Sequence, residues 1–179
     1  MSNSLDHLLT RIAQSRANYL TTIQHLTDEQ ARWKPAAAEW SILQITEHLV
    51  WAEQIGVCGM LNAINALKAG QPIWTGQSPN AGLSIEEVIA QTWQPKEQVP
   101  TVAEPRWGGT LQYWMIALAN AQHMLTELVK TANSVDLCSA IYPHPISGPL
   151  DVIQRLEFLS FHIDRHLLQA QRVMDSFEQ

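Results

Sequence analysis

The sequence predicts an all-α fold, a four-helix bundle formed by a single domain over residues 1–179. Four stretches carry apolar residues at the spacing of three and four that gives a helix one buried face, and strand patterns are almost absent. The chain of 179 residues fits one compact domain, and its 46% of hydrophobic residues can form a core. Helices of this kind bury their apolar faces best by packing against one another.

The first two long helices are predicted in the N-terminal half. The first runs from about Ser4 to about Leu26, where leucine and isoleucine build one apolar stripe. The second opens at Trp40-Ser41, because a serine followed three residues later by Gln44 forms a capping box, which satisfies two unpaired donors at a helix start. It is expected to continue to about Ala69, where a glycine and then a proline stop it.

The C-terminal half predicts two more long helices and two irregular connections. Residues 70–109 hold most of the prolines, with a short helix predicted after a second capping box at Ser84. The third long helix is expected from about Thr110 to just before Asn133. Residues 142–149 cannot form a helix, because each proline removes a backbone donor and restricts the residue before it. The fourth helix is predicted from about Leu150 to about Phe177.

Composition disfavours several classes of protein. A formal charge of −6, with 11 Lys and Arg against 17 Asp and Glu, disfavours a nucleic-acid partner. The longest apolar run, residues 113–119, is too short to span a membrane, and no secretory signal is evident. Two cysteines do not indicate a disulfide framework. We therefore expect a cytoplasmic protein with reduced thiols and neither nucleic acid nor membrane as a partner.

Three histidines are the candidate metal ligands. His162 and His166 are four residues apart in the fourth predicted helix, so their side chains lie one turn apart on the same face. His48 occupies an apolar position of the second predicted helix. In a bundle, side chains of facing helices converge in the core, where three imidazoles can bind one metal ion and leave further positions open.

Two other interpretations of these histidines must be weighed. A single histidine on an apolar face is more often a core residue with an ordinary hydrogen bond than a metal ligand. The pair also departs from the zinc-protease motif H-E-x-x-H, because Ile163 stands where that motif has its general-base glutamate. A protease of that class is therefore disfavoured, whereas metal binding by the histidines remains open.

The order and spacing of these motifs resemble the DinB-like superfamily of bacterial metal-binding four-helix bundles. The resemblance rests on three segments, namely Trp40-Ser41 followed by His48, Tyr142-Pro143-His144-Pro145 followed by Gly148-Pro149-Leu150, and His162 to Gln169 with its pattern H-x-x-x-H-x-x-Q. It covers essentially the whole chain and is weakest over residues 70–108.

The resemblance implies that His48, His162 and His166 form the metal triad of the family, which commonly holds nickel or zinc. It also implies long crossover connections between the helices and a homodimer. Ile163 is a departure, since family members often carry glutamate there. Because that residue is not a ligand, the departure bears on the chemistry of the site more than on metal binding.

Two functions follow from the resemblance. Some relatives are thiol-dependent transferases and isomerases, so the enzymatic hypothesis is metal-dependent transfer of a low-molecular-weight thiol to small electrophiles. Arg165, Gln44 and Gln169 are the candidate residues for binding such a thiol cofactor, with Arg155 as a further one, because they offer donors or charge. No catalytic residue can be assigned. The alternative is a non-catalytic, stress-related bundle in which a metal ion only stabilises the fold.

Overall fold

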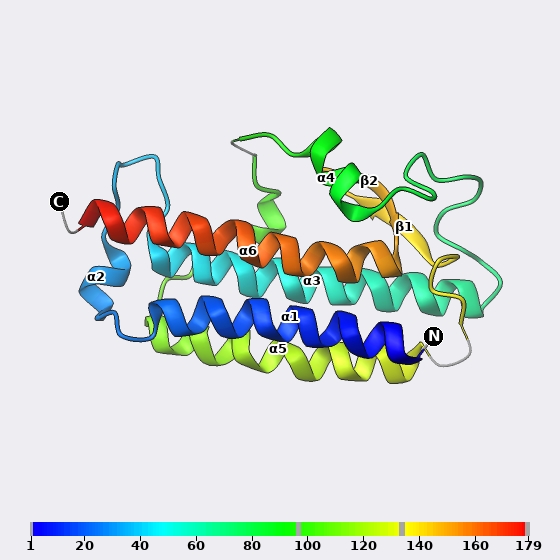
Figure 1. Cartoon of the computed structure of the whole chain (residues 1–179), viewed down its shortest axis with the longest axis horizontal. Helices are drawn as coiled ribbons and strands as arrows, with labels where there is room; N and C mark the ends of the chain where they lie inside the picture. Colours follow the sequence, from blue (N-terminus) through cyan, green and yellow to red (C-terminus); the bar gives the residue numbers. More distant parts are fainter. Residues whose placement is uncertain (1, 96–97, 133–134, 178–179) are drawn as a thin grey trace.

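The computed structural model of the protein describes residues 2–95, 98–132 and 135–177. Four long helices lie side by side and make up most of the molecule (Figure 1). They are α1 (Ser2–Ile23), α3 (Ile42–Lys68), α5 (Leu111–Thr131) and α6 (Val152–Phe177). The predicted all-α bundle is therefore confirmed. None of the described helices is both long and apolar enough to cross a membrane.

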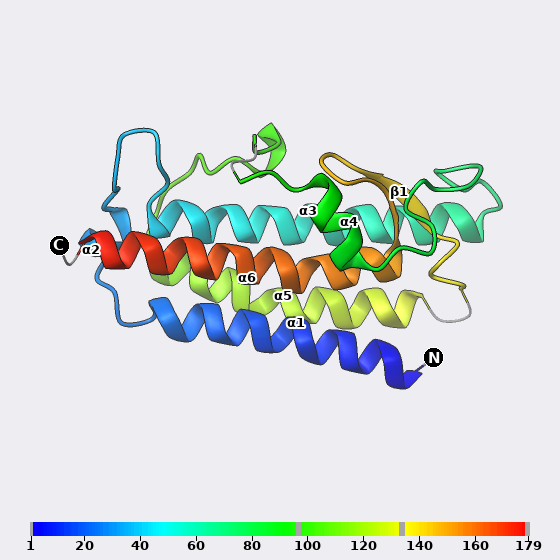
Figure 2. The same ribbon diagram turned by 45° about the horizontal axis from the view of Figure 1, so that its top comes forward.

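The helices follow the order α1, α5, α3, α6 around the bundle, since α1 and α3 each pack against both α5 and α6. Figures 1 and 2 show that α3 and α5 run in the same direction, as do α1 and α6. Parallel neighbours cannot be joined by a short loop. The chain between α3 and α5, residues 69–110, therefore returns along the bundle as the long crossover that the resemblance implied.

Short helices occur in the connections, and capping boxes start three of the helices. The predicted box at the start of α3 is present, with Ser41 Oγ accepting from the Gln44 amide and Gln44 Oε1 accepting from the Ser41 amide. The crossover contains α4 (Ile85–Thr92), which begins at the predicted second box, and the 3₁₀ helix η1 (Thr101–Ala103). The five-residue helix α2 (Asp28–Arg32) was not predicted.

A small β-hairpin corrects the prediction for the segment before α6. Strands β1 (Ile141–His144) and β2 (Gly148–Asp151) pair antiparallel, with Tyr142 opposite Leu150. Leu150 was expected in the last helix but lies in β2, and α6 begins at Val152. Gly148 has φ +71°, a left-handed conformation that glycine adopts without strain and that turns the chain back. The first helix also ends three residues earlier than expected, and Asn133 lies outside the described residues.

The core is formed by the apolar faces of all four long helices. It also contains a buried ion pair, in which Arg16 of α1 and Glu53 of α3 lie 2.6 Å apart. Arg16 also donates to Gln122 of α5 at 2.8 Å, so this network joins three helices. Removal of either charged partner would leave an unpaired charge in the interior, which is strongly unfavourable. The largest fully buried side chains include Ile12, Tyr19, Ile45, Leu49, Met60, Ile64, Trp114, Leu118 and Leu125.

The hairpin is held against α3 by Tyr142. Its hydroxyl donates to the Gly56 carbonyl at 3.1 Å and accepts from Arg155 Nε at 2.8 Å. One turn further along α3, a Cβ atom built on Gly59 would lie only 2.5 Å from the Tyr142 ring. The absence of a side chain at Gly59 is therefore required for the Tyr142 ring to pack this closely against α3.

We expect Gly59→Ala to destabilise the protein by about 1–3 kcal/mol, because the Tyr142 ring must move away from α3. This cost opposes the gain of about 0.5–1 kcal/mol that alanine brings to a helix interior. Urea denaturation gives the free energy of unfolding, and Asn62→Ala at an exposed position of the same helix is the control. A Gly59→Ala protein as stable as the control would contradict this packing.

Candidate metal centre

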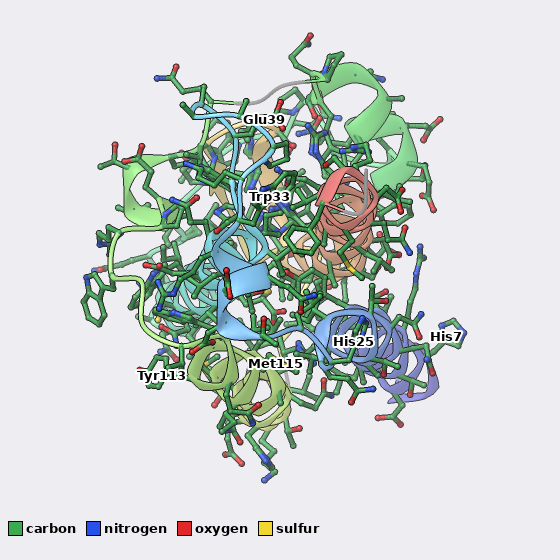
Figure 3. The ribbon with its side chains drawn as sticks, turned by 90° about the vertical axis from the view of Figure 1, so that its left-hand side faces the viewer. His7, His25, Trp33, Glu39, Tyr113 and Met115 are labelled. Atoms are coloured by element: carbon green, nitrogen blue, oxygen red, sulfur yellow. The ribbon has the colours of Figure 1, made fainter. Side chains whose placement is uncertain are left out.

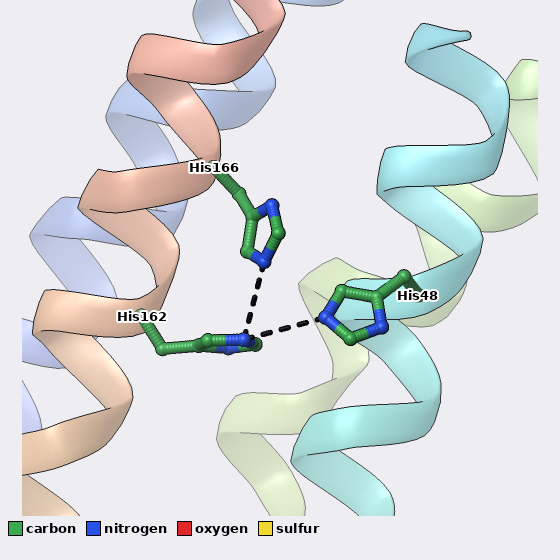
Figure 4. A group of neighbouring side chains, drawn as sticks. All are labelled: His48, His162 and His166. Carbon is green, nitrogen blue, oxygen red and sulfur yellow. Dashed lines mark hydrogen bonds between the residues drawn. The ribbon is translucent and has the colours of Figure 1, made fainter. Parts of the chain in front are cut away.

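Three of the seven histidines meet between α3 and α6. His7 of α1 and His25 of the turn after α1 are exposed and do not belong to this group (Figure 3). His48 projects from α3 toward His162 and His166, which project from successive turns of α6 (Figure 4). Nε2 of His162 lies 3.3 Å from Nε2 of His48 and 3.2 Å from Nε2 of His166. The structure therefore brings together the three histidines that the sequence singled out.

Hydrogen bonds to the outer ring nitrogens determine which nitrogen carries the proton. His48 Nδ1 lies 2.8 Å from the Ala103 carbonyl oxygen, which can only accept, so Nδ1 is the protonated nitrogen. His166 Nδ1 likewise lies 2.7 Å from Oε1 of Gln169 and donates to it. Both Nε2 atoms consequently present lone pairs toward His162. Fixing the tautomer through the outer nitrogen in this way is typical of metal-ligating histidines.

Two of the three Nε2 separations fit a tetrahedral cation, and all three ligand atoms lie within 4.8 Å of one another. Two nitrogens that each lie about 2.0–2.1 Å from a tetrahedral ion are separated by about 3.3–3.4 Å. The two Nε2–Nε2 distances, 3.3 and 3.2 Å, match that separation. Without a cation, a single Nε2 proton on His162 would have to serve two lone pairs. The residues present therefore fit a divalent metal ion, and the three histidines could hold one.

Burial keeps the three imidazoles neutral. His48 and His166 are only 5% and 8% exposed, whereas His162 is partly exposed. Burial lowers the pKa of His166 to about 3, and it lowers the pKa of His48 and of His162 as well. The neighbouring histidines and the Arg155 charge add to the effect at His162. Neutral imidazole is the form that binds metals, so no proton has to be displaced near neutral pH.

Comparison with known proteins places this fold in a family. The sequence profile of the DinB superfamily matches residues 11–170. The chain belongs to the DinB superfamily. The uncharacterized protein YuaE of Bacillus subtilis (strain 168) is 26% identical over 171 residues, which cover 92% of this chain and 96% of YuaE.

A solved structure with the same fold is the crystal structure of TT2238, described as a four-helix bundle protein. Its TM-score is 0.58 at 19% identity, and the match covers 94% of this chain and 98% of TT2238. At this level of identity the likeness shows the fold alone. The architecture of this DinB superfamily member is thus the same four-helix bundle.

The candidate thiol-binding residues are placed differently from one another. Gln169 is next to the histidines, where its side-chain oxygen orients His166. Gln44 lies one turn before His48 and closes the capping box of α3. Arg165 points away from the group, donating to the Gln94 carbonyl at 2.7 Å and stacking on Trp93, so it holds the crossover against α6. Their role in binding a cofactor stays a prediction.

Aromatic rings cover the histidines on two sides. Trp40, in the loop before α3, lies with its centroid 5.0 Å from that of His48 and 6.5 Å from that of His166. Phe158 stacks on His162 at 5.7 Å and also contacts His144 of the hairpin at 4.6 Å. These rings exclude water from the outer edges of the cluster, which strengthens any charge interaction inside it.

A buried arginine lies on the same face of α6 two turns before His162. Arg155 is 5% exposed, its guanidinium lies over the Phe158 ring at 5.1 Å, and its Nη1 has no hydrogen-bond partner among the described residues. Its positive charge is therefore not neutralised by a described carboxylate. The site combines neutral ligands with a nearby cation, which favours an anionic ligand over a cationic one.

Sequence reasoning missed Glu47, which holds the crossover in place. Its Oε1 accepts from the backbone amides of Arg106 and Trp107 at 2.7 and 2.8 Å, and its Oε2 accepts from Gly108 at 3.0 Å. Burial opposes ionisation, but these bonds and one from the Trp51 indole outweigh it and lower the pKa of Glu47. The signal in the sequence was a glutamate next to a candidate ligand, in a helical stretch of mostly apolar residues.

The metal-free protein should lose stability in acid through His144 of the hairpin and His166 of the site. Burial lowers the pKa of His144 to about 2 and of His166 to about 3, against about 6.5 when unfolded. The unfolded chain then binds more protons below about pH 6.5, so each ring lowers the free energy of unfolding by about 1.4 kcal/mol per pH unit.

Urea denaturation of the chelator-treated protein at a series of pH values measures this slope. His144→Gln keeps a side-chain acceptor for the Ser147 amide but cannot titrate, so its stability should fall less steeply than that of the wild type. An equal slope in the variant and the wild type would rule out His144 as a source of the acid sensitivity.

Proposed function

We propose that the protein binds one divalent metal ion through His48, His162 and His166 and acts on a low-molecular-weight thiol at that site. The observation that supports metal binding is the convergence of three Nε2 atoms, two pairs of them at the separation expected around one ion, with two lone pairs fixed by Nδ1–H bonds. Nickel or zinc is the expected metal, since imidazole suits both.

The protein residues have distinct roles in this proposal. The three imidazoles are the ligands, while the Ala103 carbonyl and Gln169 orient two of them. A divalent ion held by three imidazoles supplies Lewis acidity at its remaining positions, which lowers the pKa of a thiol placed there. Arg155 supplies a fixed positive charge on the same face of α6. A positive charge favours the thiolate, which is the reactive form of a thiol.

Transfer to a small electrophile is the reaction class we favour, and isomerisation through a thiol adduct is closely related. The partial exposure of His162 supports access of a small molecule to the ring cluster. The alternative is a structural metal ion in a non-catalytic bundle. It is supported by the position of the ligands on α3 and α6. An ion there would link two helices that are separated in the chain by the crossover, α5 and the hairpin.

The ligand assignment predicts the metal content of purified protein. We expect close to one divalent ion per chain in protein prepared without an affinity tag, and far less in His48→Ala and His162→Ala, because two imidazoles hold an ion much more weakly than three. Elemental analysis gives the ratio. His25→Ala, at an exposed histidine in the turn after α1, is the matched control. Wild-type protein with far below one ion per chain would overturn the assignment.

Thiol binding separates the two functions. In cobalt-substituted protein, added cysteine should change the visible absorption spectrum, because a thiolate at an open position alters the ligand field. Serine, which has a hydroxyl in place of the thiol, is the matched control and should leave the spectrum unchanged. A spectrum unaffected by cysteine, together with a large fall in melting temperature on chelation, would favour the structural metal ion instead.

A further inference from the structure

A cleft opens at the end of the bundle where α3 begins. This cleft has a volume of about 370 Å³, within the range of small-molecule sites. Three cationic side chains from two segments of the chain line it: Arg32 at the end of α2 and Lys34 just after it, and Arg106 in the crossover before α5. The loop from Trp33 to Glu39 rises beside it at the end of the bundle seen in Figure 3.

The charges of these three side chains are not neutralised by the protein. Both ion pairs in the described part of the chain lie elsewhere, one joining α1 to α3 and the other within α5. The cations instead donate to neutral backbone carbonyls: Arg32 to Gly109, Lys34 to Ala37 at 3.2 Å, and Arg106 to three carbonyls of residues 101–104. These bonds position the cations but leave their charge uncompensated in a protein of net charge −6.

The acidic side chain among the described lining residues is Glu47, and it is already engaged. Its two oxygens accept from three consecutive backbone amides of the crossover, so the carboxylate makes no ion pair with the cations, but its charge reduces the formal charge of the cleft from +3 to +2. The cleft also receives the start of α3, at Ser41 and Gln44. The amino end of this 27-residue helix adds partial positive charge on the same side.

We propose that this cleft binds a small organic anion that carries two or more negative charges on carboxylate or phosphate groups. Guanidinium forks suit both groups, and three cations that meet in one cleft match a multivalent anion better than a single charge. Gln44 in the cleft lies one helical turn from His48, a Cβ separation of about 6 Å. The cleft is therefore the anion-binding part of the substrate site, an assignment that rests on the proposed function, although the anion binding itself needs no metal.

Calorimetric titration of the metal-free protein with citrate and with pyrophosphate tests the proposal and distinguishes carboxylate from phosphate. We expect saturable binding of one anion per chain that weakens as salt is added. Each of Arg32→Gln, Lys34→Gln and Arg106→Gln should weaken it by about fivefold, and the triple variant by about a hundredfold, because each removes one charge contact in water. Backbone amide signals of residues 41–48 should shift on titration.

Lys68→Gln is the matched control, since Lys68 is also an exposed cation bonded to a backbone carbonyl but lies at the opposite end of α3. Absence of binding, or equal weakening in the control and the cleft variants, would overturn the proposal. If the protein binds the anions but contains no metal ion, the cleft proposal holds and the proposed metal function fails. If it contains a metal ion but does not bind the anions, the proposed metal function holds and the cleft proposal fails.

Discussion

The hydrogen bond from His48 Nδ1 to the Ala103 carbonyl is the interaction on which the arrangement of the site depends. It fixes the proton on the outer nitrogen and turns the Nε2 lone pair inward, as Gln169 does for His166. Without a metal ion, one proton on His162 Nε2 has to serve the two inward lone pairs of His48 and His166. A cation can instead bind the Nε2 lone pairs of all three imidazoles. The geometry of the outer bonds thus makes the cluster a better receptor for a metal ion than for a hydrogen-bond network.

This bond gives the long crossover a structural purpose. Ala103 belongs to η1, which can orient His48 only if the crossover is held on α3. Glu47, adjacent to His48, binds the next turn of the crossover through three backbone amides, and Arg165, adjacent to His166, binds the carbonyls that follow α4. The residues beside two candidate ligands therefore anchor the two ends of the segment that orients one of them. The crossover, whose apolar residues show no regular periodicity, therefore becomes part of the site through hydrogen bonds to its backbone.

The same bonds explain what the sequence could and could not predict. Helices and caps were predictable because apolar periodicity and Ser41 with Gln44 are local patterns, and the histidines were found because i and i+4 positions share a helix face. Ala103 was not predictable, since its contribution is a carbonyl group that every residue has. The hairpin was missed because its strands are four residues each and contain two prolines, with a third in the turn, which hide any alternation.

In the described part of the chain, no carboxylate that could act as a general base is hydrogen-bonded to the three rings, which limits the chemistry available at the site. Ile163, which takes the place of the glutamate in the zinc-protease motif, is fully buried in the core. The described hydrogen-bond partners of the three rings are a backbone carbonyl, a glutamine amide and one another, with no carboxylate among them. Glu47 is nearest in sequence, but backbone amides occupy its oxygens. A nucleophile that must be deprotonated by a side chain is therefore poorly served, whereas a thiol, which ionises readily beside a cation, needs no such base.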